Sequence, residues 1–589
     1  MWSLLLLACR PVPVPASAPA SVPASVPASV PVPVPVPASV QPPAVRSDAL
    51  YFALVDRFAD ARADPPGTVE PGDPQGWHGG DLEGVLAHLD HLDALGVGGL
   101  WLSPISAART EPLDTWGAYH GYWVEELGAI EPRFGDRQVL AALSSALHDR
   151  GMVLYLDMVY NHVGYDAPLV EAHPDWFHGL GDIVDWDDPV QRITHDVHGL
   201  PDLAQERGEV YAYLLEQTLP WLELASPDGL RIDAVGHLPE GFLRSLRADL
   251  RAVSPGVRLL GEVFEGNPAA LAARAAADEL DEVFDFPLMY AIQDAICGQG
   301  PMGRIAAALA VADYGGAAPV TLLDNHDTPR ILSVCGGEVE RVTTALAWQL
   351  SARGTPSVTW GTEVGLSGGA EPDNRADMRW APDGSAEPHP LGDALRQLLA
   401  LRGRWPALQR GDTRVLYLSP DQLVVARTEG PGGVLIYGGR TEIASVRWPG
   451  STADERLQPT PAISLQALQA VPARRGGRVR LEVTFAGLPA LPEGAIRRAV
   501  GASPALGGWD PGAGPPLVND QLILEVDDGS VLELRLGVAG AGGDFTWESR
   551  PSNRILLVTS DEISLNGGAP GCGPDCAPAI DGVARITWE

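Results

Sequence analysis

Three acidic residues stand at the ends of short apolar segments, where an ionised side chain is costly to bury. Asp233 occurs in GLRIDAVGH, Glu262 in LLGEVFEG and Asp327 in LLDNHDTPR. The same segments also carry Arg231, His237 and His326. This grouping predicts an acid/base site. Its chemistry fits glycoside cleavage with retention, in which one carboxylate attacks and a carboxylic acid protonates the leaving oxygen. The alternative is three unrelated buried salt bridges.

The apolar segments have the length of buried strands and alternate with amphipathic stretches. Helical periodicity runs, for example, over Leu82–Leu95 and Arg137–Arg150. Eight strand–helix repeats predict an α/β fold, a (β/α)8 TIM barrel, which carries its chemistry at the carboxyl ends of the strands. The expected strands are Leu50–Val55, Gly99–Ser103, Val153–Asp157, Gly229–Asp233, Arg258–Glu262, Glu282–Phe286, Val320–Asp324 and Pro356–Trp360.

Changes in composition divide the chain into parts. Residues 10–46 repeat Val-Pro and Pro-Ala-Ser-Val, which predicts an extended tether or a plain low-complexity spacer. The barrel is expected over 47–405, with a protruding loop domain inserted at 163–206. Short alternating segments then predict a small β-sandwich over 406–475 and a C-terminal β-sandwich module over 477–589.

The composition excludes some classes of protein. The formal charge of −35 argues against a nucleic-acid partner, because phosphates require a basic surface. An apolar fraction of 45% suits globular burial, and 589 residues are too many for one core. All 41 basic residues are arginines, so lysine chemistry is unavailable to this chain. The composition fits a protein that acts on a neutral substrate.

The N-terminal segment predicts export from a bacterial cell. Met1–Cys9 is apolar and ends in Leu-Leu-Ala-Cys, which is similar to a lipoprotein processing site. Either Cys9 is lipidated and anchors the chain in a membrane, or the segment is an ordinary secretory signal. The other four cysteines allow two disulfides, with Cys572–Cys576 the better pair and Cys297–Cys335 the remaining one.

Several segments in order resemble the sequence blocks of one enzyme family. DMVYNH (Asp157–His162), LPDL (Leu200–Leu203), GLRIDAVGH, GEVFEG and DNHD resemble those of the alpha-amylase family of glycoside hydrolases. WGAYHGYW (Trp116–Trp123) and GGAEPDNR (Gly368–Arg375) look like active-site segments of fungal-type alpha-amylases. The resemblance spans about residues 48–405 and implies the barrel with its protruding loop domain.

The resemblance implies a role for each matching residue. Asp233 would be the nucleophile, Glu262 the acid/base, and Asp327 the third acid, which holds hydroxyls of the distorted sugar. Arg231 would keep Asp233 ionised, and Tyr119 would be the aromatic ring beneath the sugar. The remaining substrate-binding residues implied are His120, His162, His237, His326, Glu371 and Arg375.

A calcium ion between the barrel and the loop domain is also implied. The matching ligands are Asn161, Asp202 and the backbone carbonyl of His237, and such oxygen ligands suit a hard cation. The alternative is a plain hydrogen-bonded cluster. Two positions depart from the family. Gly236 stands where amylases usually carry an acceptor-side lysine, and His198 stands where cyclodextrin-forming relatives have Tyr or Phe.

The C-terminal module has motifs of its own. LGGWDP (Leu506–Pro511) and FTWESRPSNR (Phe545–Arg554) resemble the starch-binding module of amylases and glucoamylases. The resemblance implies that Trp509 and Trp547 stack on glucose rings and that Arg535 replaces a lysine that binds hydroxyls. The alternative is that both tryptophans belong to a core.

These observations predict an endo-type alpha-amylase, secreted or at the cell surface, that acts as a monomer. It would hydrolyse α-1,4-glucosidic bonds of starch, glycogen or maltooligosaccharides with retention. The alternatives are a cyclodextrin glucanotransferase or maltogenic amylase on the same scaffold, and a non-catalytic starch-binding protein.

Overall fold

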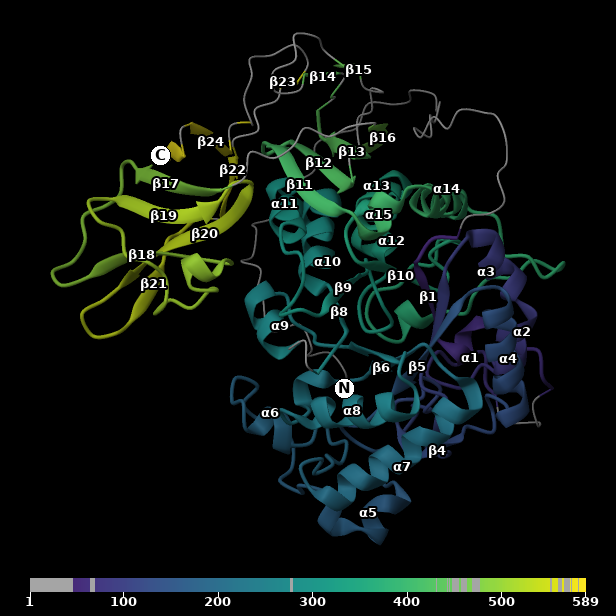
Figure 1. Cartoon of the computed structure of the whole chain (residues 1–589). Coiled ribbons are helices and arrows are strands. Elements are labelled where there is room, and N and C mark those ends of the chain that lie inside the picture. The colour runs from purple at the N-terminus through teal and green to yellow at the C-terminus, as the bar shows by residue number, and fades with distance from the viewer. Residues whose placement is uncertain are drawn as a thin grey trace, which may run out of the picture. The chain divides into compact units, whose positions relative to one another are not determined.

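Eight parallel strands close into a barrel in the computed structural model (Figure 1). The structure describes residues 46–63, 69–275, 279–430, 432–441, 443, 445–447, 455–456, 463–468, 477–550, 553–559, 564–565, 573, 575–580 and 582–588. The predicted barrel is confirmed, and each predicted strand overlaps an observed one. The barrel strands are β1 (Leu50–Ala53), β2 (Gly99–Leu102), β5 (Val153–Met158), β6 (Gly229–Ile232), β7 (Arg258–Gly261), β8 (Glu282–Phe284), β9 (Ala318–Thr321) and β10 (Thr355–Thr359).

Helices follow the strands and cover the barrel. In α4 (Arg137–Asp149), Val139, Leu140, Leu143 and Leu147 are buried at helical spacing, and the Asp136 carboxylate caps the first turn. The other helices of the barrel domain outside the loop domain are α1 (Val55–Phe58), α2 (Leu82–Ala87), α3 (Leu89–Leu95), α7 (Gly208–Ala225), α8 (Phe242–Val253), α9 (Pro268–Arg274), α10 (Phe286–Ile292), α11 (Gly303–Leu309), α12 (Ile331–Val334), α13 (Val339–Ser351) and α14 (Pro390–Arg404).

The interior of the barrel is packed with side chains and leaves no room beside β6. A Cβ atom on Gly229 would lie 2.2 Å from Tyr155 Cε1, so only glycine fits there. The Tyr155 hydroxyl in turn donates to Glu282 Oε2 at 2.7 Å. Every residue of β6 is buried, including the charged Arg231. The strand can therefore hold a charged side chain only if partners surround it.

The long connection between β5 and α7 contains the residues predicted to form the loop domain. It contains only short elements: α5 (Pro168–Ala172), a 3₁₀ turn at Pro174–Trp176, and α6 (Gln191–Thr194). A short hairpin, β3 (Ser106–Ala108) with β4 (Val124–Ile130), lies in the connection after β2.

After α15 (Pro406–Arg410) the chain forms β-sheets, as predicted. A four-stranded sheet contains β11 (Asp412–Leu418), β12 (Gln422–Glu429), β13 (Gly432–Gly439) and β16 (Ile463–Leu468). An eight-stranded sheet with its own core contains β17 (Arg478–Phe485), β18 (Ile496–Gly501), β19 (Gln521–Asp527), β20 (Ser530–Ala539), β21 (Phe545–Trp547), β22 (Arg554–Thr559), β24 (Cys576–Ile580) and β25 (Val583–Trp588).

One strand crosses the predicted boundary between the two β domains. β23 (Ser564–Leu565) pairs with β14 (Ser445–Arg447), which also pairs with β15 (Glu455–Arg456). Elements of two or three residues carry too little alternation to be predicted from sequence.

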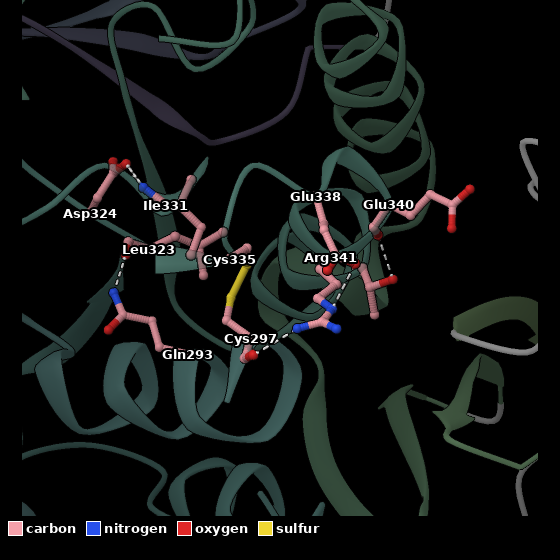
Figure 2. Close-up of a disulfide and its surroundings, with 10 residues drawn as sticks. Gln293, Cys297, Leu323, Asp324, Ile331, Cys335, Glu338, Glu340 and Arg341 are labelled. Carbon is pink, nitrogen blue, oxygen red and sulfur yellow. Dashed lines mark hydrogen bonds and ion pairs between the residues drawn. A yellow bond between two sulfur atoms is a disulfide. The ribbon is translucent and has the colours of Figure 1, made fainter. Parts of the chain in front are cut away.

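The disulfide between Cys297 and Cys335 confirms one of the two expected pairs (Figure 2). It joins the segment after α10 to the end of α12, and Arg341 Nη1 donates to the Cys297 carbonyl at 3.0 Å. Cys576 is also disulfide-bonded, whereas Cys572 and Cys9 lie outside the described residues. Within the described part of the chain, no helix combines the length and apolarity needed to cross a bilayer.

Candidate active site

The predicted acids lie at the carboxyl end of the barrel, because parallel strands bring these ends together. Asp233 directly follows β6 and Glu262 directly follows β7. Asp327 lies in the loop that follows β9. A fourth acid, Asp157, lies in β5; the sequence interpretation quoted its segment but gave it no role.

One arginine connects three of these carboxylates. The Arg231 side chain is buried, and its Nη1 donates to Asp157 Oδ1 at 2.8 Å and to Asp233 Oδ1 at 2.7 Å. Its Nη2 lies 2.9 Å from Glu262 Oε1. A guanidinium carries a single positive charge, so it cannot neutralise three ionised carboxylates. The cluster therefore favours a proton on one of them.

The cluster shifts the pKa values of these acids in opposite directions. Burial raises the pKa of Glu262 to about 8, and the charges of Asp233 and Asp327 add to the rise. Burial also raises the pKa of Asp157 to about 7. Burial alone would raise the pKa of Asp327, but His326, Arg375 and Arg231 outweigh it and lower this pKa. Glu262 is thus suited to donate a proton, and Asp327 to remain ionised.

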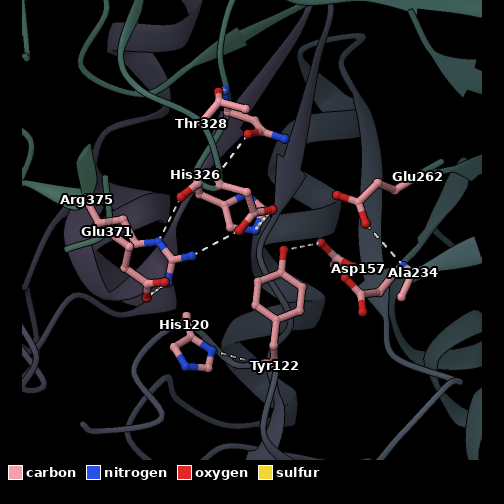
Figure 3. A network of polar contacts seen from close by, with 12 residues as sticks. His120, Tyr122, Asp157, Ala234, Glu262, His326, Thr328, Glu371 and Arg375 are labelled. Carbon is pink, nitrogen blue, oxygen red and sulfur yellow. Dashed lines mark hydrogen bonds and ion pairs between the residues drawn. The ribbon is translucent and has the colours of Figure 1, made fainter. Parts of the chain in front are cut away.

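A second charged group lies across the site from Glu262. Arg375 Nη2 donates to Asp327 Oδ1 at 3.0 Å, and Arg375 also pairs with Glu371. Its Nε donates to the His326 carbonyl at 2.9 Å, which fixes the guanidinium against the Asp327 loop. Figure 3 shows Glu371 and Arg375 on one side of Tyr122 and Glu262 on the other. The predicted grouping of Asp327, Glu371 and Arg375 is present in the structure.

Of the two tyrosines in WGAYHGYW, the partly exposed one is Tyr122 and not Tyr119. Tyr119 has no exposed surface, and Arg57 covers its ring at 3.9 Å from the centroid. It therefore has no free face for a sugar, contrary to its predicted role. Tyr122 is partly exposed, and its ring stacks on that of His326 with 5.0 Å between the centroids. Its hydroxyl donates to Asp157 Oδ2 at 3.0 Å.

The four predicted histidines are held by hydrogen bonds or stacking and favour the neutral form. His120 Nδ1 accepts from the Tyr122 backbone N–H at 3.0 Å, and His162 Nε2 lies 3.2 Å from the Tyr122 carbonyl. Burial lowers the pKa of His237 to about 4 and that of His326 to about 3. Burial also lowers the pKa of His120 and of His162. A neutral imidazole can both donate to and accept from a hydroxyl group.

Two of the three predicted calcium ligands, Asn161 and Asp202, lie side by side where the loop domain joins the barrel. The Leu203 N–H donates to the Asn161 carbonyl at 2.9 Å, which brings Asp202 beside Asn161. Both polar atoms of the Asn161 side chain are buried with no hydrogen-bond partner among the described residues. Burial raises the pKa of Asp202 to about 7, and His178 Nδ1 lies 2.6 Å from its Oδ2. A buried, unpaired amide oxygen beside a buried carboxylate fits a hard cation.

The described residues hold no group of three or more His, Cys, Asp or Glu side chains that could bind a metal by themselves. A calcium site here would therefore depend on the Asn161 amide and backbone carbonyls as well as Asp202.

The two tryptophans of the predicted sugar platform lie close to each other in the C-terminal module. The Trp509 and Trp547 rings lie 6.4 Å apart at 60°, and Trp547 is 39% exposed. Arg535 Nη2, however, donates hydrogen bonds to the backbone carbonyls of Glu548 and Arg550, at 2.8 and 2.7 Å. These hydrogen bonds hold the segment after Trp547 in place, whereas the predicted role of Arg535 was to bind sugar hydroxyls.

A closed (β/α)8 barrel that gathers carboxylates and a buried arginine at the carboxyl ends of its strands has the equipment of a glycoside hydrolase. The family model described as "Alpha amylase, catalytic domain" matches residues 52–386. The chain belongs to the alpha-amylase family and is a glycoside hydrolase.

Among curated relatives, a cyclomaltodextrinase of Geobacillus thermopakistaniensis is 31% identical over 69% of this chain and 71% of its own length. A maltogenic alpha-amylase of Bacillus acidopullulyticus is 31% identical over 62% of this chain and 64% of its own. Among solved structures, the alpha-amylase of Geobacillus thermoleovorans complexed with acarbose is 27% identical, with a TM-score of 0.61. That match covers 85% of this chain and 98% of the other.

Proposed function

We propose that this protein hydrolyses α-1,4-glucosidic bonds in maltooligosaccharides and cyclodextrins. The support is that its relatives are named cyclomaltodextrinase and maltogenic amylase. These names favour the maltogenic alternative over the endo-acting alpha-amylase expected from the sequence. The chain is a glycoside hydrolase whichever of these two specificities it has.

The observation that carries the mechanism is the double contact of Arg231 with Asp233 and Glu262. Two carboxyl groups that share one guanidinium lie close together, and retaining enzymes need a spacing of about 5 Å. In our proposal Asp233 attacks the anomeric carbon, and Glu262 passes its proton to the glycosidic oxygen. Asp327, fixed by Arg375, accepts hydrogen bonds from hydroxyls of the sugar that is cleaved.

Product analysis tests this proposal. Purified protein should be incubated separately with β-cyclodextrin, maltotriose and soluble starch, and the products should be separated over time. We expect maltose and glucose to appear faster from the two small substrates than from starch. Proton NMR of the first product should show the α-anomer. Long linear products with a rapid fall in starch viscosity would favour an endo-amylase, and new cyclic products would favour a glucanotransferase.

We further propose that Asn161, Asp202 and the His237 carbonyl bind Ca²⁺. The support is the unpaired Asn161 amide and the buried Asp202 carboxylate. A calcium ion at this point would hold the loop domain to the barrel and would supply no step of the reaction.

Removal of calcium should destabilise the protein, because a ligand that binds only the folded state stabilises it. We expect excess chelator to lower the melting temperature by several degrees, about 2–4 °C for each kcal/mol in a domain of this size. Added calcium should restore the value, whereas magnesium should not. Asp202→Ala should lose both the response and bound calcium measured by elemental analysis. An Asp202→Ala variant that responds to chelator like the parent would contradict this site.

We also propose that the C-terminal module binds α-glucans through Trp509 and Trp547. Trp547→Ala should lower adsorption to granular starch by at least about tenfold, because a truncated aromatic anchor commonly costs 2 kcal/mol or more. Cleavage of soluble maltotriose should be retained. Ile580→Ala, which removes an apolar side chain that is 68% exposed, is the matched control and should adsorb normally. Equal adsorption by both variants would mean that the indoles are not the platform.

A further inference from the structure

One helix of the barrel packs on the segment that carries the proton donor. The helix α10 follows β8, and the ring of its first residue, Phe286, lies 4.5 Å from that of Phe264, centroid to centroid. Phe264 lies two residues after Glu262. At its other end α10 continues into a π-helical turn, Gln293–Cys297. Such turns are rare and often lie at functional sites.

The π-helical turn is hydrogen-bonded to the segment that carries the third acid. The Asp327 loop, residues 322–330, connects β9 to α12. Gln293 Nε2 donates to the carbonyl of Leu323, in the first part of this loop, at 2.7 Å (Figure 2). The helix and its π-helical turn therefore contact the segments of both acids, one at each end.

A disulfide ties the far side of the same loop to the same turn. Cys297 is the last residue of the π-helical turn, and Cys335 directly follows α12. Asp324 Oδ2 accepts from the Ile331 N–H at 2.6 Å, which holds the start of α12 against the loop. The chain is thus attached to one helical turn both before and after Asp327. Attachment at both ends restricts the positions that a loop can adopt.

The position of Asp327 affects Glu262 as well as the substrate. Glu262 faces Arg231, Asp233 and Asp327, and the negative charge of Asp327 contributes to the raised pKa of Glu262. In the proposed mechanism Asp327 also binds hydroxyls of the sugar that is cleaved. A shift of the loop would weaken both effects, and a misplacement of about 1 Å can cost an enzyme about 100-fold in rate.

We propose that Gln293 and the Cys297–Cys335 disulfide are positioning groups that hold the Asp327 loop at a fixed place relative to Glu262. They act through the loop and not on the substrate itself. This inference rests on the proposed hydrolysis of α-glucans. It gives the disulfide a role beyond stability, because a folded chain without this bond would cleave its substrate more slowly.

The test removes each attachment and measures both the rate and its pH dependence. In Cys297→Ala/Cys335→Ala we expect kcat on maltotriose to fall about tenfold at a temperature well below the melting transition. Gln293→Met keeps the length of the side chain but removes its donor, and we expect a smaller fall. In both variants the alkaline fall of kcat/KM should move to lower pH, because a displaced Asp327 would raise the pKa of Glu262 less.

Two matched variants serve as controls. Cys576→Ala breaks a different disulfide, in the C-terminal module. Gln409→Met removes a comparable hydrogen bond, from Gln409 Nε2 to the Arg402 carbonyl at 3.1 Å, between α15 and α14. Both variants should keep the kcat and the pH profile of the parent.

The outcomes separate this inference from the proposed function. A cysteine variant with a lower melting temperature but unchanged kcat and pH profile would show a purely structural disulfide and overturn the proposal. Parent-like kinetics in Gln293→Met would overturn the role of that residue. If the cysteine variant does not fold, Gln293→Met, which retains the disulfide, decides the result. A parent that cleaves no maltotriose would overturn the proposed function and this inference with it, whereas an active parent with unchanged variants would overturn the inference alone.

Discussion

Replacement of Asp233 by asparagine is expected to reduce kcat on maltotriose by roughly 10⁴-fold or more, because an amide is not a nucleophile for covalent glycosyl transfer. The fold should survive, since the amide oxygen can still accept from Arg231 Nη1. Steady-state rates and the melting temperature should be measured together. A large loss of activity with a retained melting curve is the expected pair of results.

A loss of the ion pair with Arg231 could by itself lower the rate, so the nucleophile needs direct evidence. A fluorinated maltosyl fluoride that slows the second step should leave a glycosyl group on the protein. Peptide mass spectrometry should find this group on Asp233 and not on Asp157, although both carboxylates bind the same Nη1 atom. Labelling of any other acid would overturn the assignment.

Replacement of Glu262 by glutamine should lower kcat/KM on maltotriose by about 10²–10⁴-fold, the usual contribution of a general acid. The loss on α-maltosyl fluoride should be much smaller, because fluoride departs with little help from a proton. The parent rate should also depend on pH in a defined direction. Glu262 acts in its protonated form and burial raises its pKa to about 8, so kcat/KM should fall as the pH rises through about 8.

The pH profile of the variant provides the decisive comparison. Glutamine does not titrate, so the fall above about pH 8 should disappear in Glu262→Gln. An alkaline fall that persists in the variant would assign it to another group, such as Asp157, whose pKa is raised to about 7. Equal losses on the two substrates would show that Glu262 does not protonate the leaving group.

The barrel and its main acids could be predicted because one local signal carries both. A short apolar run that ends in an acid marks a buried strand and also places that acid at the carboxyl end, as at Asp233 and Glu262. Asp157 also follows a short apolar run, in β5. Its contact with Arg231 shows that this pattern placed it among the acids of the site as well.

Features that depend on loop conformation could not be predicted. WGAYHGYW contains two tyrosines, and the sequence does not show which of them is buried. In the folded loop, which turns at Gly121 with φ of +84°, Tyr122 is partly exposed and Tyr119 is buried. The hydrogen bond from Gln293 to Leu323 likewise joins two segments with no shared periodicity. The hydrogen bonds from Arg535 to backbone carbonyls depend on the path of the chain after Trp547.

The single guanidinium at the centre of the acids has a consequence for the timing of proton transfer. While Asp233 is a free anion, its charge helps to raise the pKa of Glu262. Once Asp233 becomes an ester it carries no charge, so that contribution vanishes and Arg231 attracts the remaining carboxylates more strongly. The pKa of Glu262 should then drop just after the residue has given up its proton. The group is left as an anion at the moment when an incoming water molecule must be deprotonated, and hydrolysis of the ester returns the cluster to its starting charge.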